Sequence, residues 1–105
     1  MSDHVGLTWR IREGMAGEYD RNHATVWREL EERMRELGVT RFSIFRLGDV
    51  VFAHLVVDDY LEFTQRYQVD PVALEWEKQW DDVLIVDNPD PETGWPERLT
   101  HVWSM

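Results

Sequence analysis

The stretch Tyr19-Asp20-Arg21-Asn22-His23 lies near the start of a run, residues 15–37, with the periodicity of an amphipathic helix. A helix turns about 100° per residue, so side chains three or four positions apart share one face. Gly38 follows the run directly and suits the left-handed residue that commonly ends a helix. The sequence therefore predicts one continuous helix over residues 15–37. Its inward face carries Tyr19, His23, Val26, Leu30, Met34 and Leu37.

Patterns typical of β-strands lie on both sides of this helix. Residues 5–11 alternate apolar with more polar side chains, which predicts a strand with one buried face. Residues 39–46 and 50–57 predict two more strands, joined by a hairpin turn at 47–49. The segment 50–57 is apolar at every position except His54, so we expect a central strand covered on both faces. In a domain this small the second cover would be a partner subunit, which predicts a homodimer.

Two aspartate caps predict a further helix in two short pieces. Asp58-Asp59 precedes the first piece, and Asp70-Pro71 begins the second with Asp as the cap and Pro in the first turn. A proline-rich loop is expected over residues 87–96, and residues 99–105 are expected to form a last strand.

The expected order is strand, helix, strand, strand, helix in two pieces, strand. This is the order of the split βαβ, or ferredoxin-like, fold, an α+β architecture with an antiparallel sheet and helices on one face. A chain of 105 residues has the size of one domain, so residues 1–105 are expected to fold as a unit. The fold hosts many chemistries, so function has to be argued from particular residues.

Charge and composition exclude several classes of function. Asp and Glu number 21 against 11 Lys and Arg, a net charge of −10, which disfavours nucleic acid and anionic membrane surfaces as partners. The chain has no cysteine, so disulfides, thiolate catalysis and Cys-ligated metals are excluded. Neither a secretory signal nor an apolar run of about 18 residues is visible, and we expect a cytoplasmic protein.

His23 is the leading candidate for chemistry. A histidine side chain ordinarily exchanges its proton near neutral pH, which suits acid–base catalysis. The other interpretation is a histidine at the edge of the core that bonds a backbone carbonyl, and helical position alone does not separate the two. His54 and His101 are interpreted as packed or interface histidines rather than as second acid–base groups. The histidines lack the spacing of metal ligands, so no metal site is expected.

Segment 18–30 contains Tyr19, His23 four residues later, then Trp27 and the pair Glu29-Leu30. This segment resembles the signature of the L-rhamnose mutarotase family. The likeness covers nearly the whole chain, continuing through Leu37-Gly38, Ser43-Ile44-Phe45, Phe52-Ala53, Trp76, Asp82-Val83, Asn88-Pro89-Asp90 and the aromatic C-terminal segment.

The resemblance implies a small cytoplasmic homodimer of the dimeric α+β barrel type. Members of that family interconvert the α and β anomers of L-rhamnose or a related 6-deoxyhexose, with no cofactor or metal. By position, His23 would be the catalytic proton donor, with Tyr19 and Trp76 in the sugar site. Trp76 fits equally well as a core residue on the apolar face of its helix.

Two positions depart from the family pattern. Phe42 stands where the pattern has a sugar-contacting tyrosine, so the ring is kept and the hydroxyl is lost. Glu77 stands where the pattern has a second tryptophan, and is either a replacement polar contact or an exposed side chain; the pattern slightly favours exposure. Both positions bear on which sugar is bound, because such contacts distinguish the stereochemistry of hydroxyl groups.

Two other functions stay open. One is a cofactor-free monooxygenase or isomerase of the dimeric α+β barrel type, whose aromatic or polyketide substrate would favour an apolar pocket without the Tyr19 hydroxyl. The other is a small-molecule-binding dimer without catalysis. Trp95, between Gly94 and Pro96, is either a lid over the pocket or an anchor of its own loop.

Overall fold

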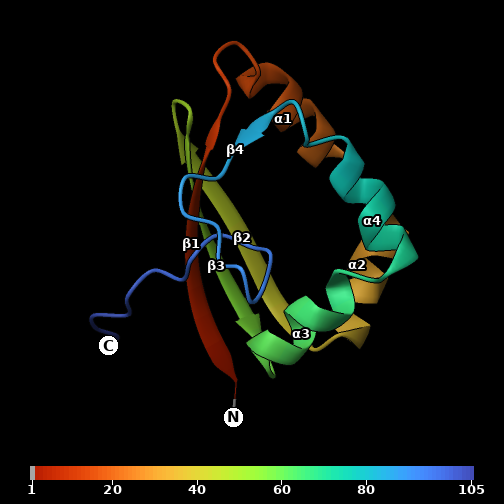
Figure 1. The fold of residues 1–105 in the computed structure, drawn as a ribbon, viewed down its shortest axis with the longest axis vertical. Helices are drawn as coiled ribbons and strands as arrows, with labels where there is room; N and C mark the ends of the chain where they lie inside the picture. Colours follow the sequence, from red (N-terminus) through yellow and green to blue (C-terminus); the bar gives the residue numbers. More distant parts are fainter. Residues whose placement is uncertain (1) are drawn as a thin grey trace.

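The computed structural model describes residues 2–105 and shows one sheet with helices along one face (Figure 1). The strands form an antiparallel sheet in the order β2-β3-β1-β4. This is the predicted ferredoxin-like α+β fold. In chain order the elements are β1 (Asp3–Ile11), α1 (Ala16–Ala24), α2 (Arg28–Glu36), β2 (Val39–Leu47), β3 (Val50–Val57), α3 (Tyr60–Tyr67), α4 (Pro71–Lys78) and β4 (Leu84–Ile85).

The central strands β1 and β3 pair along almost their whole length, from Asp3 opposite Val57 to Arg10 opposite Val50. Alternate apolar side chains of both strands point toward the helices and are buried there, as the period of two predicts. The hairpin between β2 and β3 turns at Gly48, whose φ of 59° is in the left-handed region that favours glycine. The buried face of β1 is the one that the alternation predicted, whereas in β3 only the structure shows which alternate residues are buried.

The prediction of one continuous helix over residues 15–37 is wrong, because the helix is broken between α1 and α2. Thr25 (φ −133°, ψ 72°) and Trp27 (φ −61°, ψ 130°) leave the helical region. The β-branched pair Thr25-Val26 and the aromatic Trp27 lose side-chain freedom in a helix, which makes this the weakest point of the run. The break lets the helices follow an arc opposite the sheet (Figure 1).

The predicted strand over residues 99–105 is also wrong, and the fourth strand is β4. Leu84 and Ile85 pair with Ile11 and Arg10 at one end of β1. In the C-terminal segment the Leu99 amide donates to the Gly6 carbonyl at 2.8 Å, after which the chain leaves the sheet (Figure 1). Residues 100–105 pair with no strand within residues 2–105, so their backbone groups make no ladder hydrogen bonds.

Three predicted helix boundaries are confirmed by their local chemistry. Gly38 follows α2 with a φ of 100°. Asp59 caps α3 by accepting from the Glu62 amide at 3.0 Å. Asp70 caps α4 by accepting from the amides of Val72 and Ala73, with Pro71 in the first turn. The helices of the second half begin where the sequence places them.

Strand β3 was expected to be covered on both faces, but within this chain the helices cover only one. Val51, Ala53 and the other inward residues are buried, whereas Phe52 on the outer face is 48% exposed. The outer face therefore presents apolar side chains to the surroundings, and the expected partner subunit stays a prediction.

Candidate functional site

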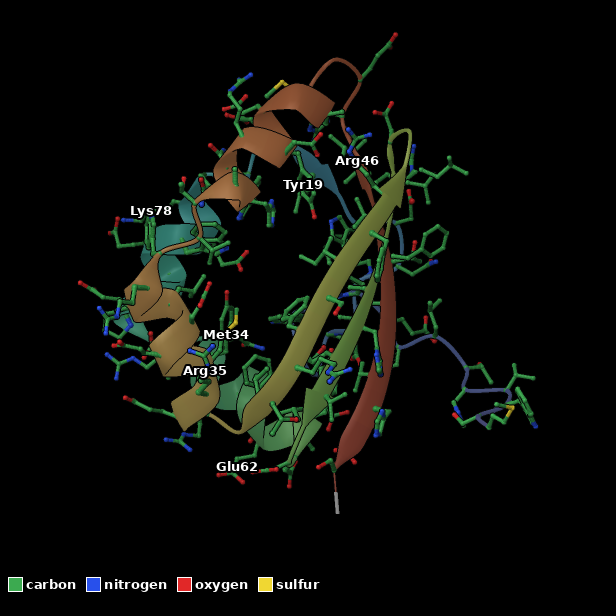
Figure 2. All side chains as sticks on the ribbon, turned by 180° about the vertical axis from the view of Figure 1, so that it is seen from behind. Tyr19, Met34, Arg35, Arg46, Glu62 and Lys78 are labelled. Atoms are coloured by element: carbon green, nitrogen blue, oxygen red, sulfur yellow. The ribbon has the colours of Figure 1, made fainter. Side chains whose placement is uncertain are left out.

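A cavity of about 560 Å³ lies between the sheet and the helices, in the size range of small-molecule sites. Figure 2 shows the side chains of Tyr19 and Met34 pointing from their helices toward the sheet, into this region. The cavity walls bring together all five side chains predicted for the site. These are Tyr19 and His23 on α1, Phe42 on β2, and Trp76 and Glu77 on α4.

The imidazole of His23 is anchored through one nitrogen. Its Nδ1 lies 2.9 Å from the carbonyl oxygen of Tyr19, one turn earlier in α1. A carbonyl oxygen can only accept, so Nδ1 carries a proton and Nε2 is the nitrogen left for exchange. The sequence left two interpretations of His23 open, a bond to a backbone carbonyl and a place in the functional site. In the structure His23 has both, because it bonds the Tyr19 carbonyl and also lines the cavity.

Aromatic rings fix the orientation of the imidazole. The His23 ring stacks on Trp80 with centroids 4.8 Å apart and an interplanar angle of 26°. Trp76 meets it edge-on at 5.8 Å, and the Tyr19 ring lies 4.4 Å away. Trp76 is only 6% exposed, so it is at once a core residue and a cavity wall. Trp80 was not predicted for the site, although its position one turn after Trp76 placed it on the same face.

The hydroxyl of Tyr19 lies beside the indole of Trp9. Tyr19 Oη and Trp9 Nε1 are buried, and neither has a well-formed hydrogen bond within residues 2–105. Burial raises the pKa of Tyr19 to about 12, although the Trp9 N–H acts in the opposite direction. Tyr19 therefore stays neutral at physiological pH and serves as a hydrogen-bonding group rather than as a base.

Glu77 makes a short hydrogen bond to a second tyrosine in the cavity wall. Tyr67 Oη on α3 donates to Glu77 Oε1 at 2.6 Å. Glu77 keeps an accessible surface, as the sequence favoured, but the side chain lines the cavity. Burial by surrounding protein atoms raises its pKa, and the Tyr67 bond lowers it in part. Tyr67 was not predicted, because only the packing of α3 against α4 brings the two groups together.

Trp95 closes another part of the wall. Its ring centroid lies 5.2 Å from that of Tyr67, 5.6 Å from Phe63 and 6.3 Å from Phe42. The loop that carries it is held where Gln68 Nε2 donates to the Thr93 carbonyl. Trp95 is thus both a cavity residue and the anchor of its loop.

The remaining histidines lie elsewhere. His54 is exposed on the outer face of the sheet, where its Nε2 is 3.2 Å from His4 Nδ1. His101 lies in the exposed C-terminal segment, 2.7 Å from Ser104 Oγ through its Nε2. Neither lines the cavity, so neither is a second acid–base group there.

Within residues 2–105, no three His, Asp or Glu side chains are grouped so that they could hold a metal ion. In the same residues, none of the helices has the length and apolar character needed to cross a bilayer.

A family model described as L-rhamnose mutarotase matches residues 4–105. The chain belongs to this family. It is 29% identical over 82 residues to an L-rhamnose mutarotase of Lactiplantibacillus plantarum, covering 76% of this chain and 78% of that protein. An L-rhamnose mutarotase of Enterococcus faecalis is 27% identical over 75 residues, which is 70% of this chain and 71% of that one. A UPF0734 protein of Dictyostelium discoideum is 31% identical over 64 residues, 57% of this chain and 51% of its own length.

Solved structures confirm the fold type. A crystal structure of an L-rhamnose mutarotase from Formosa agariphila superposes with a TM-score of 0.76 at 21% identity, covering 98% of both chains. The tetracenomycin F2 cyclase of Streptomyces glaucescens gives a TM-score of 0.63, also at 21% identity and 98% coverage of both. The family match confirms the predicted family and its class of enzyme, an isomerase of the mutarotase type. The monooxygenase-like alternative is not better supported.

Proposed function

We propose that this protein is a mutarotase that interconverts the α and β anomers of L-rhamnose or a related 6-deoxyhexose. The observation that carries the proposal is His23 in the cavity wall, with Nδ1 held by a carbonyl at 2.9 Å and its ring fixed by aromatic neighbours. A fixed imidazole with one free nitrogen is suited to proton transfer near neutral pH.

The reaction needs only proton transfers. His23, protonated on both nitrogens, gives the Nε2 proton to the ring oxygen while the hydroxyl on C1 loses its proton. The bond from C1 to the ring oxygen breaks and an aldehyde forms at C1. Rotation about C1–C2 and closure by the reverse transfers give the other anomer. Catalysis of this kind contributes about 10²- to 10⁴-fold to a rate.

The cavity wall combines polar and apolar groups as a deoxysugar requires. Tyr19 Oη and Trp9 Nε1 are buried groups whose hydrogen bonding a sugar hydroxyl would complete. Phe42 and Trp95 lie on an apolar part of the wall that suits C–H bonds and a methyl group. Phe42 lacks the hydroxyl of the tyrosine in the family pattern, so one hydrogen bond to the sugar is lost. Such a bond contributes about 0.5–1.5 kcal/mol net. The sugar preference is therefore proposed to differ from that of relatives with a tyrosine there.

Saturation-transfer NMR on equilibrated sugars tests the activity directly. L-Rhamnose, L-fucose and further aldoses are compared with and without protein, and exchange between the two anomer signals is measured. We expect faster exchange for L-rhamnose or another 6-deoxyhexose. Exchange that stays at the uncatalysed rate for every sugar, at high protein concentration, would refute the mutarotase proposal.

We also propose that the protein is a homodimer that associates through the outer face of the sheet. Phe45 and Leu47 on β2 lie directly opposite Phe52 and Val50 on β3, and all four side chains are exposed. Contiguous exposed apolar side chains mark association surfaces. We propose in addition that the protein is cytoplasmic, on the basis of its family alone.

Phe52→Glu is expected to convert the dimer to a monomer, because it places a charge at the centre of this apolar patch. Light scattering coupled to size-exclusion chromatography measures the mass in solution. Leu74→Glu is the matched control, since Leu74 on α4 has nearly the same exposure (47% against 48% for Phe52) but lies outside the patch and the cavity wall. A wild-type monomer, or an unchanged mass for Phe52→Glu, would contradict the proposed interface.

A further inference from the structure

Ring opening moves two protons, and His23 accounts for one of them. The ring oxygen gains a proton while the hydroxyl on C1 loses one, so a second group has to accept it. We propose that Glu77 is this second proton-transfer group and that Tyr67 positions its carboxylate. This inference rests on the proposed function and goes beyond it by assigning the base.

The position of Glu77 fits the role. It follows Trp76, whose ring lies 5.8 Å from that of His23, and both residues line the same cavity. One oxygen, Oε1, accepts from Tyr67 Oη at 2.6 Å. Within residues 2–105 the Tyr67 bond is the one hydrogen bond of this carboxylate, so Oε2 is free to accept from a sugar hydroxyl.

The other acidic and phenolic groups of the wall are less suited. Glu31 pairs with Arg35 at 3.8 Å, so its carboxylate already has a cationic partner. Burial raises the pKa of Tyr19 and of Tyr67, so both hydroxyls stay protonated. This leaves Glu77 as the carboxylate of the wall that a neutral donor holds and that has no cationic partner within residues 2–105.

Several charged or titratable groups surround Glu77. Burial is the main cause that raises its pKa, Tyr67 lowers it through the hydrogen bond, and the negative charge of Asp81 raises it. A carboxylate whose pKa is raised is a stronger base and therefore a better proton acceptor. The titratable groups that share the cavity wall are Tyr19 and His23 from α1, Glu31 and Arg35 from α2, Arg41 from β2 and Tyr67 from α3.

The proton balance closes without another reactant. The Glu77 carboxylate takes the proton of the C1 hydroxyl as His23 protonates the ring oxygen, and the bond from C1 to the ring oxygen breaks. On closure, His23 recovers its proton from the C5 hydroxyl, whose oxygen bonds C1. Glu77 then returns its proton to the oxygen on C1, and both side chains are restored.

Glu77→Gln tests the assignment, because the amide keeps the size of the side chain and can accept from Tyr67 but cannot take up a proton at neutral pH. We expect kcat/KM for anomer exchange to fall by about 10²-fold or more. Glu75→Gln is the control for lost charge: Glu75 lies two residues earlier on α4, is exposed, pairs with Lys78 at 2.7 Å and is expected to leave the rate unchanged.

The stability of Glu77→Gln is expected to be preserved. Folding raises the pKa of Glu77, so the stabilisation by its protonated form is lost as pH rises through the folded pKa. At neutral pH the uncharged glutamine removes that cost, and thermal unfolding is expected at a temperature no lower than that of the wild type. A lost rate in this variant is then not explained by unfolding.

The pH profile separates proton transfer from a structural role. If Glu77 acts as a carboxylate, kcat/KM rises with pH through its pKa. Tyr67→Phe removes the bond that lowers this pKa, so the acidic limb is expected to move to higher pH. Glu77→Gln is expected to abolish that limb.

The outcomes distinguish this inference from the proposed function. An active wild type with an equally active Glu77→Gln variant, or an acidic limb that Tyr67→Phe leaves in place, overturns the role of Glu77 and leaves the mutarotase intact. A wild type that accelerates no anomer exchange overturns both.

Discussion

His23→Gln is expected to lower kcat/KM for anomer exchange by about 10²- to 10⁴-fold, the usual contribution of a positioned acid–base group. The amide of glutamine cannot donate and recover a proton near neutral pH. Trp80, which stacks on His23, also packs against Trp76 and Tyr19, so these rings are expected to keep their places in the cavity wall without the imidazole. Sugar binding is therefore expected to change less than the rate. The measurement is NMR anomer exchange with the uncatalysed rate subtracted.

His101→Gln is the matched control for this change. It makes the same substitution in the exposed C-terminal segment, outside the cavity wall, and full activity is expected. If His23→Gln kept the wild-type rate, the assigned role of His23 would be wrong even though the chain belongs to the family.

Phe63→Ala is expected to cost about 3–5 kcal/mol of unfolding free energy, as removal of a fully buried aromatic ring usually does. Phe63 on α3 is 0% exposed, and its ring lies 5.4 Å from Tyr67 and 5.6 Å from Trp95. For a domain near 100 residues, each kcal/mol lowers Tm by about 4–8 °C, so a loss of more than about 10 °C is expected.

Leu61→Ala on the same helix is the control, because Leu61 is exposed and a change within about 0.5 kcal/mol is expected. Both variants are unfolded at one fixed protein concentration, since the proposed dimer would make Tm depend on concentration. A Tm for Phe63→Ala within a few degrees of the wild type would show that α3 and the Trp95 loop do not depend on this ring.

Local signals predicted much of the fold, because capping and alternation act over a few residues. Gly38, Asp59 and Asp70 end or begin helices where expected, and the alternation in β1 set its buried face. Periodicity could not detect the break at Thr25–Trp27, since Tyr19 and His23 before it and Leu30 and Met34 after it all line the cavity. It also could not exclude a strand over residues 99–105, because pairing depends on whether the segment runs along a sheet edge.

The site divides in the same way. Tyr19 and His23 lie one helical turn apart, so their shared face survives the break and was predictable from spacing. Trp80 repeats that spacing after Trp76 and could have been included. Tyr67 on α3 and Glu77 on α4 are ten residues apart in the sequence. Their hydrogen bond depends on the angle between the two helices, which no local pattern encodes.

The Tyr19-to-His23 stretch by itself determined that a tyrosine and a histidine share one helical face, and with the rest of the chain it determined the family. Only the tertiary structure decided that Trp76 and Trp80 pack on the His23 ring and that Glu77 faces the cavity. The physical reason is range: helix geometry fixes neighbours within a turn, whereas contacts between α1, α3, α4 and the sheet depend on how distant segments pack.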